Sequence, residues 1–449
     1  MHTQPTFVVF LFPYCSSMDI EELYRHYQHD PKVLIDSRQK GASGIFFGLK
    51  GEQVDGGKYA AQALENGCTL AIVDDTHDVS DARIVRVHDV LATLQALALF
   101  HRKQLAIPVI GLTGTNGKTT TKELLVKVLE SRYKVGYTRG NFNNHIGVPL
   151  TLLNMEPEAD IAVVEMGANQ PGDIRELCHI ALPTHGLITN IGKAHLEGFG
   201  SEEGVLKTKC ELFEFLAKHH GEAFVTGSDE RLVACSKRLN LSSHFFHTPD
   251  SVYAEWPEQK SPLVAIDLVH KGFRQRVHSN LSGIYNANNM VAAAAVGLAF
   301  GLSLKTISKQ LATYVPENNR SQYTQTANNH LLVDAYNANP TSMFLALDNV
   351  NRIAMNGTQK LVILGDMFEL GDESIQEHQK IVDQLASDQD VEVWLVGPRF
   401  GQTRRPKACK HFATTDVLLN YLKNTTLRNK LILIKGSRGM RLERCLELL

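Results

Sequence analysis

The sequence has almost no excess of charge of either sign and no long hydrophobic run. With 46 Lys and Arg against 48 Asp and Glu, its formal net charge is -2 at pH 7. Such a chain has no broad electrostatic field that would attract nucleic acid or a membrane surface. The apolar stretch over residues 7–12 is followed at once by Pro13 and falls far short of the ~20 residues that span a bilayer. We therefore expect no nucleic-acid partner and no membrane insertion.

Cysteine is sparse, and the spacing of the cysteines does not indicate a disulfide framework. There is no CxxC pair, and the number of cysteines is odd: Cys15, Cys68, Cys178, Cys210, Cys235, Cys409 and Cys445. This pattern favours a reduced protein with scattered buried thiols over a disulfide scaffold or a zinc site. The chain is 43% hydrophobic and 21% charged, which is typical of a globular protein. We expect it to be cytoplasmic and monomeric.

The length of 449 residues is too great for one ordinary hydrophobic core. No internal repeat or low-complexity tract is visible. We expect four segments: an N-terminal extension over residues 1–17, a first domain over 18–105, a central domain over 106–315 and a C-terminal domain over 316–449. The extension is inferred because Asp19 and Glu22 have the spacing of a capped helix start, directly after a candidate initiator at Met18.

Apolar strand patterns alternate with helical patterns and predict an α/β fold. In the first domain the expected strands are 33–35, 46–47 and 69–73, with helices over 58–65 and 90–103. The central domain should contain strands 109–113, 161–164 and 185–189, with helices from 118, over 205–216 and over 287–298. The C-terminal domain should be a smaller doubly wound domain with strands 331–333, 361–364, 391–396 and 431–434. This rhythm predicts parallel sheets with ligands at the carboxyl ends of the strands.

The strongest local signal is a strand, a glycine-bearing loop and a helix in direct succession. Backbone N–H groups of such a loop point at phosphate oxygens, and the helix N-terminus adds partial positive charge. Lys118 is expected to reach the β- and γ-phosphates of ATP, and the Thr119 hydroxyl to bind Mg²⁺. The loop departs from the general GxxxxGK[ST] pattern, because Leu112 stands where the first glycine is expected. The predicted ATP-binding residues are Gly114, Thr115, Asn116, Gly117, Lys118, Thr119 and Thr120.

Three further residues of the central domain are candidates for metal chemistry. Glu165 follows an apolar strand and would lie at the carboxyl edge of the sheet, where a metal ligand is needed. A solvated loop carboxylate is the alternative. His195 follows the next strand and is either a ligand or a hydrogen-bonded polar histidine. Lys209 lies on a helical segment, where the residues alone favour a surface lysine.

Polar groups also follow the strands of the C-terminal domain. Arg320 comes directly after the segment Pro316–Asn319, and the runs 334–340 and 435–439 each follow a strand. Basic and Asn or Asp groups at strand ends suit phosphate, carboxylate and ribose binding. Ordinary polarity of the loops between strands and helices is the alternative for each run taken singly.

Taken together, these residues resemble the Mur ligases, the family that builds the peptide stem of bacterial peptidoglycan. The resemblance extends from Asp19 to the C-terminus and is strongest to the members that add D-alanyl-D-alanine. Motifs typical of those members stand at 138–149 (TRGNFNNHIGVP), 165–174 (EMGANQPGDI), 336–340 (YNANP), 364–371 (LGDMFELG) and 435–440 (KGSRGM). Several long motifs in the right order are far more specific than a phosphate loop alone.

The resemblance implies three α/β domains: an N-terminal UDP-substrate-binding domain, a central P-loop ATPase domain with a mostly parallel sheet, and a C-terminal Rossmann-like domain. It assigns the catalytic roles to Lys118, Glu165, His195 and Lys209. Two Mg²⁺ sites are implied, one at Thr119 and Glu165, the other at His195 and a CO₂-derived carbamate on Lys209. The remaining ATP contacts would be Asn289 to adenine, Arg320 to phosphate and Asp334 to ribose.

The resemblance also assigns the groups that bind the substrate. Those expected to bind the uridine diphosphate are Ser37, Arg38 and Lys50. Those expected nearer the reacting end are Asn143, Asn144, His145, Tyr336 and Asn339. One departure from the family is visible, because a single aspartate, Asp334, stands where a pair is common.

The activity implied is an ATP-dependent amide ligation. ATP phosphorylates the carboxylate of UDP-MurNAc-tripeptide, and the amine of D-Ala-D-Ala attacks the acyl phosphate, forming UDP-MurNAc-pentapeptide. The rival ligases are a sister enzyme that adds the third stem residue and a folylpolyglutamate synthase-like enzyme, and the motifs at 165–174 and 336–340 argue against both. A P-loop switch or kinase would leave the C-terminal motifs unused. An inactive scaffold is disfavoured because the predicted catalytic residues are intact.

Overall fold

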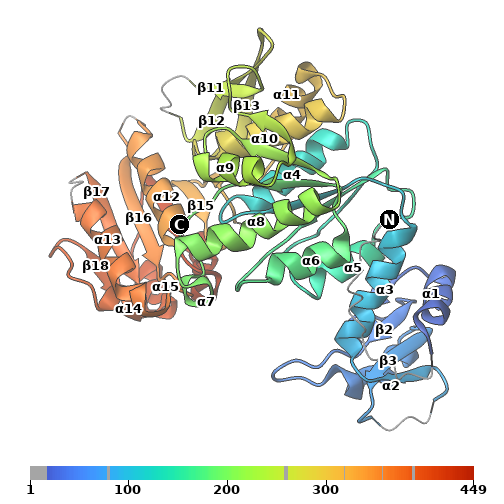
Figure 1. Cartoon of the computed structure of the whole chain (residues 1–449). Coiled ribbons are helices and arrows are strands. Elements are labelled where there is room, and N and C mark those ends of the chain that lie inside the picture. The colour runs from blue at the N-terminus through green and yellow to red at the C-terminus, as the bar shows by residue number, and fades with distance from the viewer. Residues whose placement is uncertain (1–17, 78–80, 257–260, 318, 356, 387–389) are drawn as a thin grey trace. The chain divides into compact units, whose positions relative to one another are not determined.

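The chain folds into two compact units in a computed structural model, which describes residues 18–77, 81–256, 261–317, 319–355, 357–386 and 390–449 (Figure 1). The first unit comprises the chain up to Ile107 together with Gly136–Ala159 and Glu176–Leu182; the second comprises Pro108–Val135, Asp160–Arg175 and Pro183–Leu449. The expected extension over residues 1–17 lies outside the described residues. Within the described ranges, no helix is both long enough and apolar enough to cross a membrane.

The first unit is built on a parallel sheet with the order β1 (Val33–Leu34), β2 (Ile45–Phe47), β3 (Leu70–Asp74) and β4 (Ile84–Val87). Its helices are α1 (Ile20–His29), η1 (Gly56–Tyr59), α2 (Ala60–Glu65), α3 (Val90–Gln104) and α5 (Gly147–Leu153). The side chain of Asp19 accepts a hydrogen bond from the backbone N of Glu22 at 2.7 Å, which confirms the predicted helix start. The helix expected over 58–65 begins as a 3-10 turn and becomes α-helical at Ala60.

Two segments distant in sequence complete the first unit. The hydroxyl of Tyr27 in α1 donates to the backbone O of Leu153 in α5 at 2.7 Å. The buried Arg102 of α3 donates from Nε to the backbone O of Ala181 at 2.8 Å. The first unit is therefore held together by side chains that reach the backbone of later segments.

The second unit contains a parallel sheet with the order β10 (Ser242–Phe246), β9 (Glu222–Thr226), β8 (His185–Ile188), β5 (Val109–Thr113) and β7 (Ile161–Glu165). Its helices here are α4 (Lys118–Leu129), α7 (Leu196–Phe199), α8 (Glu202–Lys218), α9 (Glu230–Arg238), α10 (Asn286–Ala299) and α11 (Leu304–Thr313). The elements β6 (Val135–Tyr137) and α6 (Asp173–Ala181) lie where the chain passes between the units. The strands and helices predicted for this region are confirmed, and β9, β10, α7, α9 and α11 are additions.

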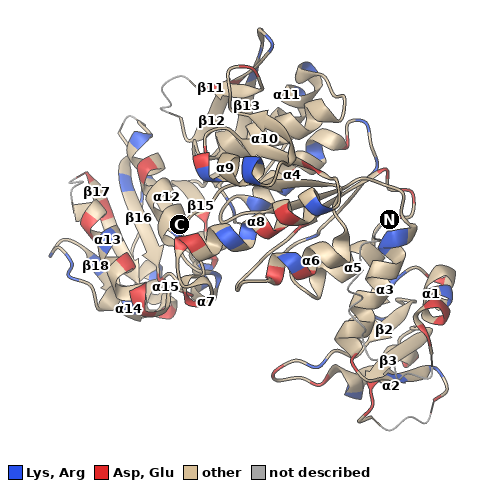
Figure 2. Cartoon of the chain, viewed as in Figure 1, with Lys and Arg blue, Asp and Glu red and all other residues tan. Residues whose placement is uncertain are grey.

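Charges of both signs are interleaved on the helices, as Figure 2 shows along α8. That helix has Glu202 and Glu203 in its first turn and Lys218 in its last turn. Each charge then complements the helix dipole at its own end. Glycine lets α8 lie close on the sheet, since a Cβ on Gly186 of β8 would stand 2.5 Å from the side chain of Leu216.

The C-terminal sheet is mixed, which refines the expected doubly wound domain. Its parallel part has the order β15 (His330–Asp334), β19 (Lys430–Lys435), β16 (Gln359–Gly365), β17 (Val391–Val396) and β18 (Lys410–Phe412). On the β15 side it continues antiparallel through β14 (Gln322–Gln325), β13 (Phe273–Ser282), β12 (Leu263–His270) and β11 (Tyr253–Glu255). The helical segments are α12 (Pro340–Arg352), η2 (Gly371–Glu373), α13 (Ser374–Ala386), α14 (Pro398–Gly401), α15 (Thr415–Lys423), η3 (Arg438–Met440) and η4 (Leu442–Leu448).

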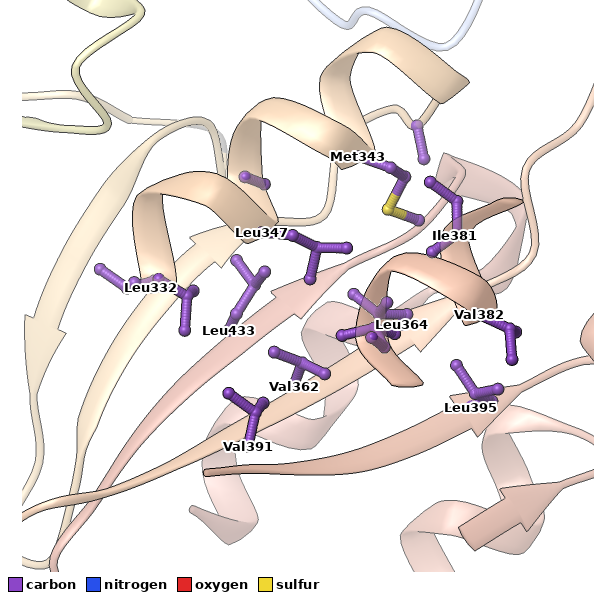
Figure 3. Close-up of a cluster of buried hydrophobic side chains, with 14 of the residues drawn as sticks. Leu332, Met343, Leu347, Val362, Leu364, Ile381, Val382, Val391, Leu395 and Leu433 are labelled. Carbon is purple, nitrogen blue, oxygen red and sulfur yellow. The ribbon is translucent and has the colours of Figure 1, made fainter. Parts of the chain in front are cut away.

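The core of this domain lies between α12, α13 and the parallel strands (Figure 3). Alternate residues of each strand enter it, as the twofold periodicity of a strand requires. The residues labelled in the figure are Leu332, Met343, Leu347, Val362, Leu364, Ile381, Val382, Val391, Leu395 and Leu433. The other strand residues, among them Trp394 and Ile432, pack in a second cluster with Leu418 of α15. Burial on both faces explains the continuous apolar runs of these strands.

Candidate active site

The phosphate loop joins β5 to α4, as the sequence predicts. Two of its glycines have backbone angles that other residues rarely adopt, with φ +143° at Gly114 and +76° at Gly117. A Cβ on Gly117 would lie 2.6 Å from Oδ1 of Asn289, and a Cβ on Gly114 would collide with Thr189. Asn289 and Thr189 therefore come so close to the loop backbone that these two positions have no room for a larger residue.

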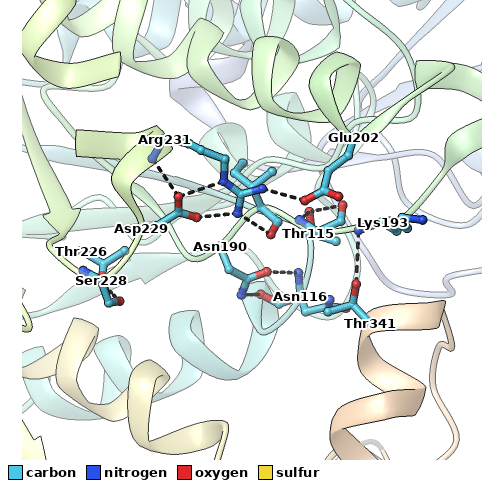
Figure 4. Close-up of polar contacts among 12 residues, drawn as sticks. Thr115, Asn116, Asn190, Lys193, Glu202, Thr226, Ser228, Asp229, Arg231 and Thr341 are labelled. Atoms are coloured by element: carbon cyan, nitrogen blue, oxygen red, sulfur yellow. Dashed lines mark hydrogen bonds and ion pairs between the residues drawn. The ribbon is translucent and has the colours of Figure 1, made fainter. Parts of the chain in front are cut away.

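The end of β8 holds the phosphate loop from the side (Figure 4). The backbone N of Thr115 donates to the backbone O of Asn190, and the backbone N of Asn116 donates to Oδ1 of Asn190, both at 3.0 Å. The hydroxyl of Thr189 donates to the backbone O of Asn116 at 2.7 Å. These hydrogen bonds tie the backbone of the phosphate loop to the segment after β8.

Lys118, the first residue of α4, folds back over this loop. Its Nζ donates to the backbone O of Gly114 at 2.8 Å and to that of Thr115 at 3.2 Å. Burial lowers the pKa of Lys118, the carboxylate of Glu165 opposes that shift, and the positive charge of Arg320 adds to it. Phosphate groups beside Lys118 would stabilise its charged form, so this position suits an anion.

Thr119 and Glu165 lie side by side at the carboxyl edge of the sheet. The hydroxyl of Thr119 donates to Oε1 of Glu165 at 3.2 Å, and both residues are buried. A hydroxyl and a carboxylate next to a phosphate-binding loop fit Mg²⁺, which commonly takes few protein ligands and completes its shell with phosphate and water. Among the described residues, no three His, Cys, Asp or Glu side chains converge as a metal site would require.

Lys209 lies deep in the protein, with 2% of its surface exposed. Burial lowers its pKa well below the usual value, the charge of Lys118 lowers it further, and Asp173 and Glu211 oppose the shift. Its Nζ is 5.4 Å from the centre of the Phe199 ring. The alternative of a surface lysine is therefore excluded, and the amine is held in an environment that favours its neutral form.

His195 contacts the same aromatic ring from another side. Its imidazole meets the Phe199 ring edge to face, with 6.2 Å between ring centres. Its Nδ1 lies 2.5 Å from Oε2 of Glu369, and this contact lowers the pKa of the Glu369 carboxyl group. His195 and Lys209 thus contact the same aromatic ring. Nδ1 of His195 is paired with Glu369, a C-terminal residue to which the sequence analysis gave no role.

Arg231 of α9 is also missing from the predicted site, and it contacts the segment after β8 (Figure 4). Its guanidinium donates to the backbone O of Ile191 at 3.1 Å and pairs with Asp229 and Glu202 at 2.8 and 2.6 Å. Arg231 therefore anchors the backbone directly after Asn190.

The C-terminal residues Asp334 and Lys435 form a pair at neighbouring strand ends. Nζ of Lys435 lies 2.5 Å from Oδ2 of Asp334 and also donates to the backbone O of Asn337 at 3.2 Å. Oδ1 of Asp334 accepts a hydrogen bond from the backbone N of Ser321 at 3.4 Å. Asp334, which the sequence analysis expected at the ribose, is therefore oriented by the buried Lys435.

Arg320 stacks on Tyr336. The central carbon of its guanidinium is 3.5 Å from the centre of the tyrosine ring. Arg438 approaches the same ring at 5.1 Å, and its Nη1 donates to the Tyr336 hydroxyl at 3.2 Å. The Tyr336 ring therefore contacts two cations, Arg320 and Arg438, which are far apart in the sequence.

Asn339, Thr341 and Asn289 also contact the central segments. Nδ2 of Asn339 donates to Oδ1 of Asn116 at 2.7 Å, and the hydroxyl of Thr341 accepts a hydrogen bond from the backbone N of Lys193 at 3.2 Å (Figure 4). Asn289 is buried against Gly117 and donates to Oδ1 of Asn286. The structure therefore brings Asn116, Lys118, Thr119, Glu165, Asn289 and Asn339 together.

The remaining predicted substrate residues belong to the first unit. Arg38 forms a two-pronged pair with Asp36 at 2.8 and 2.7 Å, which lowers the pKa of that carboxyl group to about 2. The hydroxyl of Ser37 donates to the side chain of Gln62 at 2.8 Å. Lys50 is exposed on the turn after β2.

The run 143–145 stands before α5. Oδ1 of Asn144 accepts a hydrogen bond from the backbone N of Gly147, the first residue of α5, at 2.9 Å. The backbone O of His145 accepts a hydrogen bond from Gln95 at 3.1 Å. Asn143 lies directly before them, with its backbone N bonded to the backbone O of Asn141.

Known proteins are similar to this chain in both sequence and fold. Three family models match in succession, described as Mur ligase family, catalytic domain (residues 32–110), Mur ligase middle domain (112–297) and Mur ligase, glutamate ligase domain (319–438). The UDP-N-acetylmuramoyl-tripeptide--D-alanyl-D-alanine ligase of Bacillus subtilis (strain 168) is 34% identical over 422 residues, which cover 92% of this chain and 91% of that protein. The chain belongs to the Mur ligase family. The resemblance drawn from the motifs is confirmed, and so is the expectation of three α/β domains.

Two solved Mur ligase structures match over nearly the whole chain. MurF from Acinetobacter baumannii is 32% identical with a TM-score of 0.80, and the alignment covers 93% of this chain and 92% of that one. The MurF ligase from Thermotoga maritima, solved in complex with ADP, is 27% identical with a TM-score of 0.82, covering 93% and 96%. Both matches extend through the first unit and the second.

Proposed function

We propose that this protein is an ATP-dependent ligase that joins D-Ala-D-Ala to UDP-MurNAc-tripeptide and so makes the UDP-MurNAc-pentapeptide precursor of peptidoglycan. The observation that carries the proposal is the loop from Gly114 to Thr120 beside Glu165. It occurs in a chain 34% identical, over 92% of its length, to a ligase named for that reaction. The protein binds ATP, and a matching Mur ligase structure holds ADP.

The reaction has two steps. The terminal carboxylate of the tripeptide attacks the γ-phosphorus of ATP, and the bond to the β-phosphate oxygen breaks, which gives an acyl phosphate and ADP. The amine of D-Ala-D-Ala then attacks the acyl carbon, phosphate leaves, and the amine loses a proton as the amide forms. Lys118 and the loop N–H groups hold the β- and γ-phosphates, where charge is redistributed during the transfer.

Two Mg²⁺ sites accompany the nucleotide in this proposal. Thr119 and Glu165 would hold one ion, and His195 and a carbamate on Lys209 would hold the other. When bound, Mg²⁺ neutralises phosphate charge and reduces the repulsion between ATP and the carboxylate. The buried amine of Lys209 suits the carbamate, because only a neutral amine adds to CO₂ and this environment disfavours the charged form.

The other nucleotide contacts come from both domains of the second unit. Asn289 contacts adenine, Arg320 reaches a phosphate, and Asp334 binds the ribose. Lys435 orients Asp334 through the 2.5 Å contact. Tyr336 holds Arg320 in reach of the phosphates, since the Arg320 charge already acts on Lys118.

Substrate-binding roles are proposed for residues of each unit taken by itself. The residues proposed for the UDP end are Ser37, Arg38 and Lys50, and those for the peptide end are Asn143, Asn144, His145, Tyr336 and Asn339. We assign the substrate-binding domain to residues 18–105, the ATPase domain to 106–315 and the C-terminal domain to 316–449. The active species is a monomer in this proposal.

Phosphate release tests the function directly. Purified protein is incubated with ATP, Mg²⁺ and UDP-MurNAc-tripeptide, with and without D-Ala-D-Ala. The released phosphate is measured, and the product is identified by mass spectrometry. Release that requires both substrates, with a pentapeptide product, is the expected result. Turnover with single amino acids instead of the dipeptide would reassign the chain to a sister ligase, and no turnover with any amine would refute the proposal.

A further inference from the structure

The turn between β2 and η1 is tightly folded. The backbone N of Gly56 donates to the backbone O of Leu49 at 3.0 Å, and the backbone N of Gly51 donates to the backbone O of Val54 at 2.8 Å. A Cβ on Gly48 would lie 2.8 Å from the Cα of Gly57, so the two arms of the turn are in backbone contact. This turn presents Lys50, which is exposed at its outer end.

His77 ties one arm of that turn to the sheet. Its Nδ1 lies 2.8 Å from Oδ1 of Asp74, the last residue of β3, and its Nε2 lies 3.3 Å from Oδ2 of Asp55. Asp55 in turn accepts a hydrogen bond from the backbone N of Gly57 at 3.2 Å and so caps η1. Each ring nitrogen therefore has a carboxylate partner, and the pair of contacts connects the strand end to the start of η1.

The imidazole also packs against the turn at Gly57. A Cβ on Gly57 would lie 2.5 Å from Cε1 of His77, so the ring fills the space that a side chain at position 57 would take. The side chain of His77 is only 14% exposed. Lys58 also approaches Asp55, but at 4.0 Å and with a largely exposed side chain, so His77 is the closer and more buried of these two partners.

We propose that His77 is a positioning residue, which through Asp55 holds the turn over residues 48–57 in the shape that presents Lys50 to the UDP end of the substrate. The inference rests on the proposed function, which places the uridine diphosphate at this turn. His77 does not itself contact substrate. Without it the turn must be ordered each time substrate binds, and that entropic cost weakens binding without touching the chemical step.

The kinetic test compares His77→Ala with wild type in the full-length protein. We expect KM for UDP-MurNAc-tripeptide to rise about tenfold, equivalent to about 1.4 kcal/mol of binding free energy. The kcat value and the KM values for ATP and D-Ala-D-Ala should stay at the wild-type level. His88→Ala is the matched control, because His88 is an exposed histidine of the same unit whose Nδ1 is 3.7 Å from Asp75, and it should change nothing.

A second variant, Gly57→Ala, reaches the same contact from the other side. The added methyl group displaces the His77 ring, so the same selective rise in KM is expected. An unchanged KM in both variants would overturn the inference. So would a parallel loss of kcat and of every affinity together with a lowered Tm, because that pattern marks a general loss of structure.

Amide hydrogen exchange over residues 48–57 separates this inference from the proposed function. Faster exchange confined to the turn in His77→Ala supports positioning even in a protein that does not turn over UDP-MurNAc-tripeptide, a result that would refute only the function. Unchanged exchange in a protein that does catalyse the ligation would refute only the role of His77.

Discussion

Nδ2 of Asn339 donates a hydrogen bond to Oδ1 of Asn116 in the phosphate loop at 2.7 Å. Oδ1 of the same side chain caps α12. The cap is made by the backbone N of Ser342, which donates to Asn339 at 2.9 Å. The start of α12 and the nucleotide loop are therefore linked through one amide side chain. A substitution can separate the link from the cap.

Replacing Asn339 by serine should preserve the helix and weaken the loop contact. Serine is a good N-cap but is too short to reach Asn116, whereas Asn339→Ala loses both contacts and about 1 kcal/mol of stability. We expect kcat/KM for ATP to fall in both variants and the free energy of unfolding to fall only in Asn339→Ala. Wild-type ATP kinetics in Asn339→Ser would show that the link to Asn116 is not used.

Thr119 and Glu165 should determine the dependence on Mg²⁺. Thr119→Val keeps the shape but removes the hydroxyl, so the Mg²⁺ concentration for half-maximal activity should rise about tenfold, which is about 1.4 kcal/mol. Thr119→Ser retains the hydroxyl and should stay near wild type. Glu165→Gln should abolish activity yet leave the protein at least as stable, because it removes a charge from a buried position. A titration of phosphate release against Mg²⁺ distinguishes these outcomes.

The phosphate loop could be predicted because everything that defines it is local. The apolar run over 109–113 forms a fully buried strand, and Gly117 and Lys118 follow in fixed order. The pairs Asp334–Lys435 and His195–Glu369 could not be derived from local pattern, since they depend on which strand ends become neighbours. The motifs containing Lys435 and Glu369 were visible, but their partners were not.

Two of the strands that were missed, β10 and β13, share a physical cause. Three of the five residues of β10 are exposed, and in β13 exposed polar residues alternate with buried ones. Such segments lack the continuous apolar run that revealed the fully buried parallel strands.

Lys209 should carry a carbamate under an atmosphere that contains CO₂. Burial lowers the pKa of Lys209 and so favours the neutral amine, the form that adds to CO₂. We expect ¹³CO₂ to give a carbamate carbon signal in the wild type that is lost in Lys209→Ala and kept in Lys207→Ala, an exposed lysine of the same helix. Activity should be lost in Lys209→Ala and partly restored by short carboxylates. Full activity of that variant without any additive would contradict the proposal.

Tyr336 should act on ATP binding through its ring and not through its hydroxyl. Tyr336→Phe keeps the face on which Arg320 stacks at 3.5 Å and loses only the hydrogen bond from Arg438. Tyr336→Leu loses the stacking, which is worth about 0.5–2 kcal/mol for a partly desolvated cation. KM for ATP should therefore rise several-fold in the leucine variant and little in the phenylalanine variant. Equal effects in the two would assign the role to the hydroxyl.

The core behind the C-terminal site offers a test of stability alone. Leu347 of α12 is 2% exposed and packs in the cluster of Figure 3, while Leu345 on the same helix is 39% exposed. Leu347→Ala should lower the free energy of unfolding by about 2–5 kcal/mol through lost burial and the cavity it leaves, whereas Leu345→Ala should change it by less than about 0.5 kcal/mol. Urea denaturation followed by circular dichroism measures both.

The same pair of variants also tests whether nucleotide binding depends on this packing. Because α12 begins at the residues that meet the phosphate loop, a loosened α12 should weaken ATP binding. The stabilisation that ATP confers grows with the ratio of its concentration to its dissociation constant. We therefore expect saturating ATP to raise the Tm of Leu345→Ala as much as that of the wild type, and that of Leu347→Ala by less. An equal rise in all three would show that the packing around α12 affects stability without affecting the site.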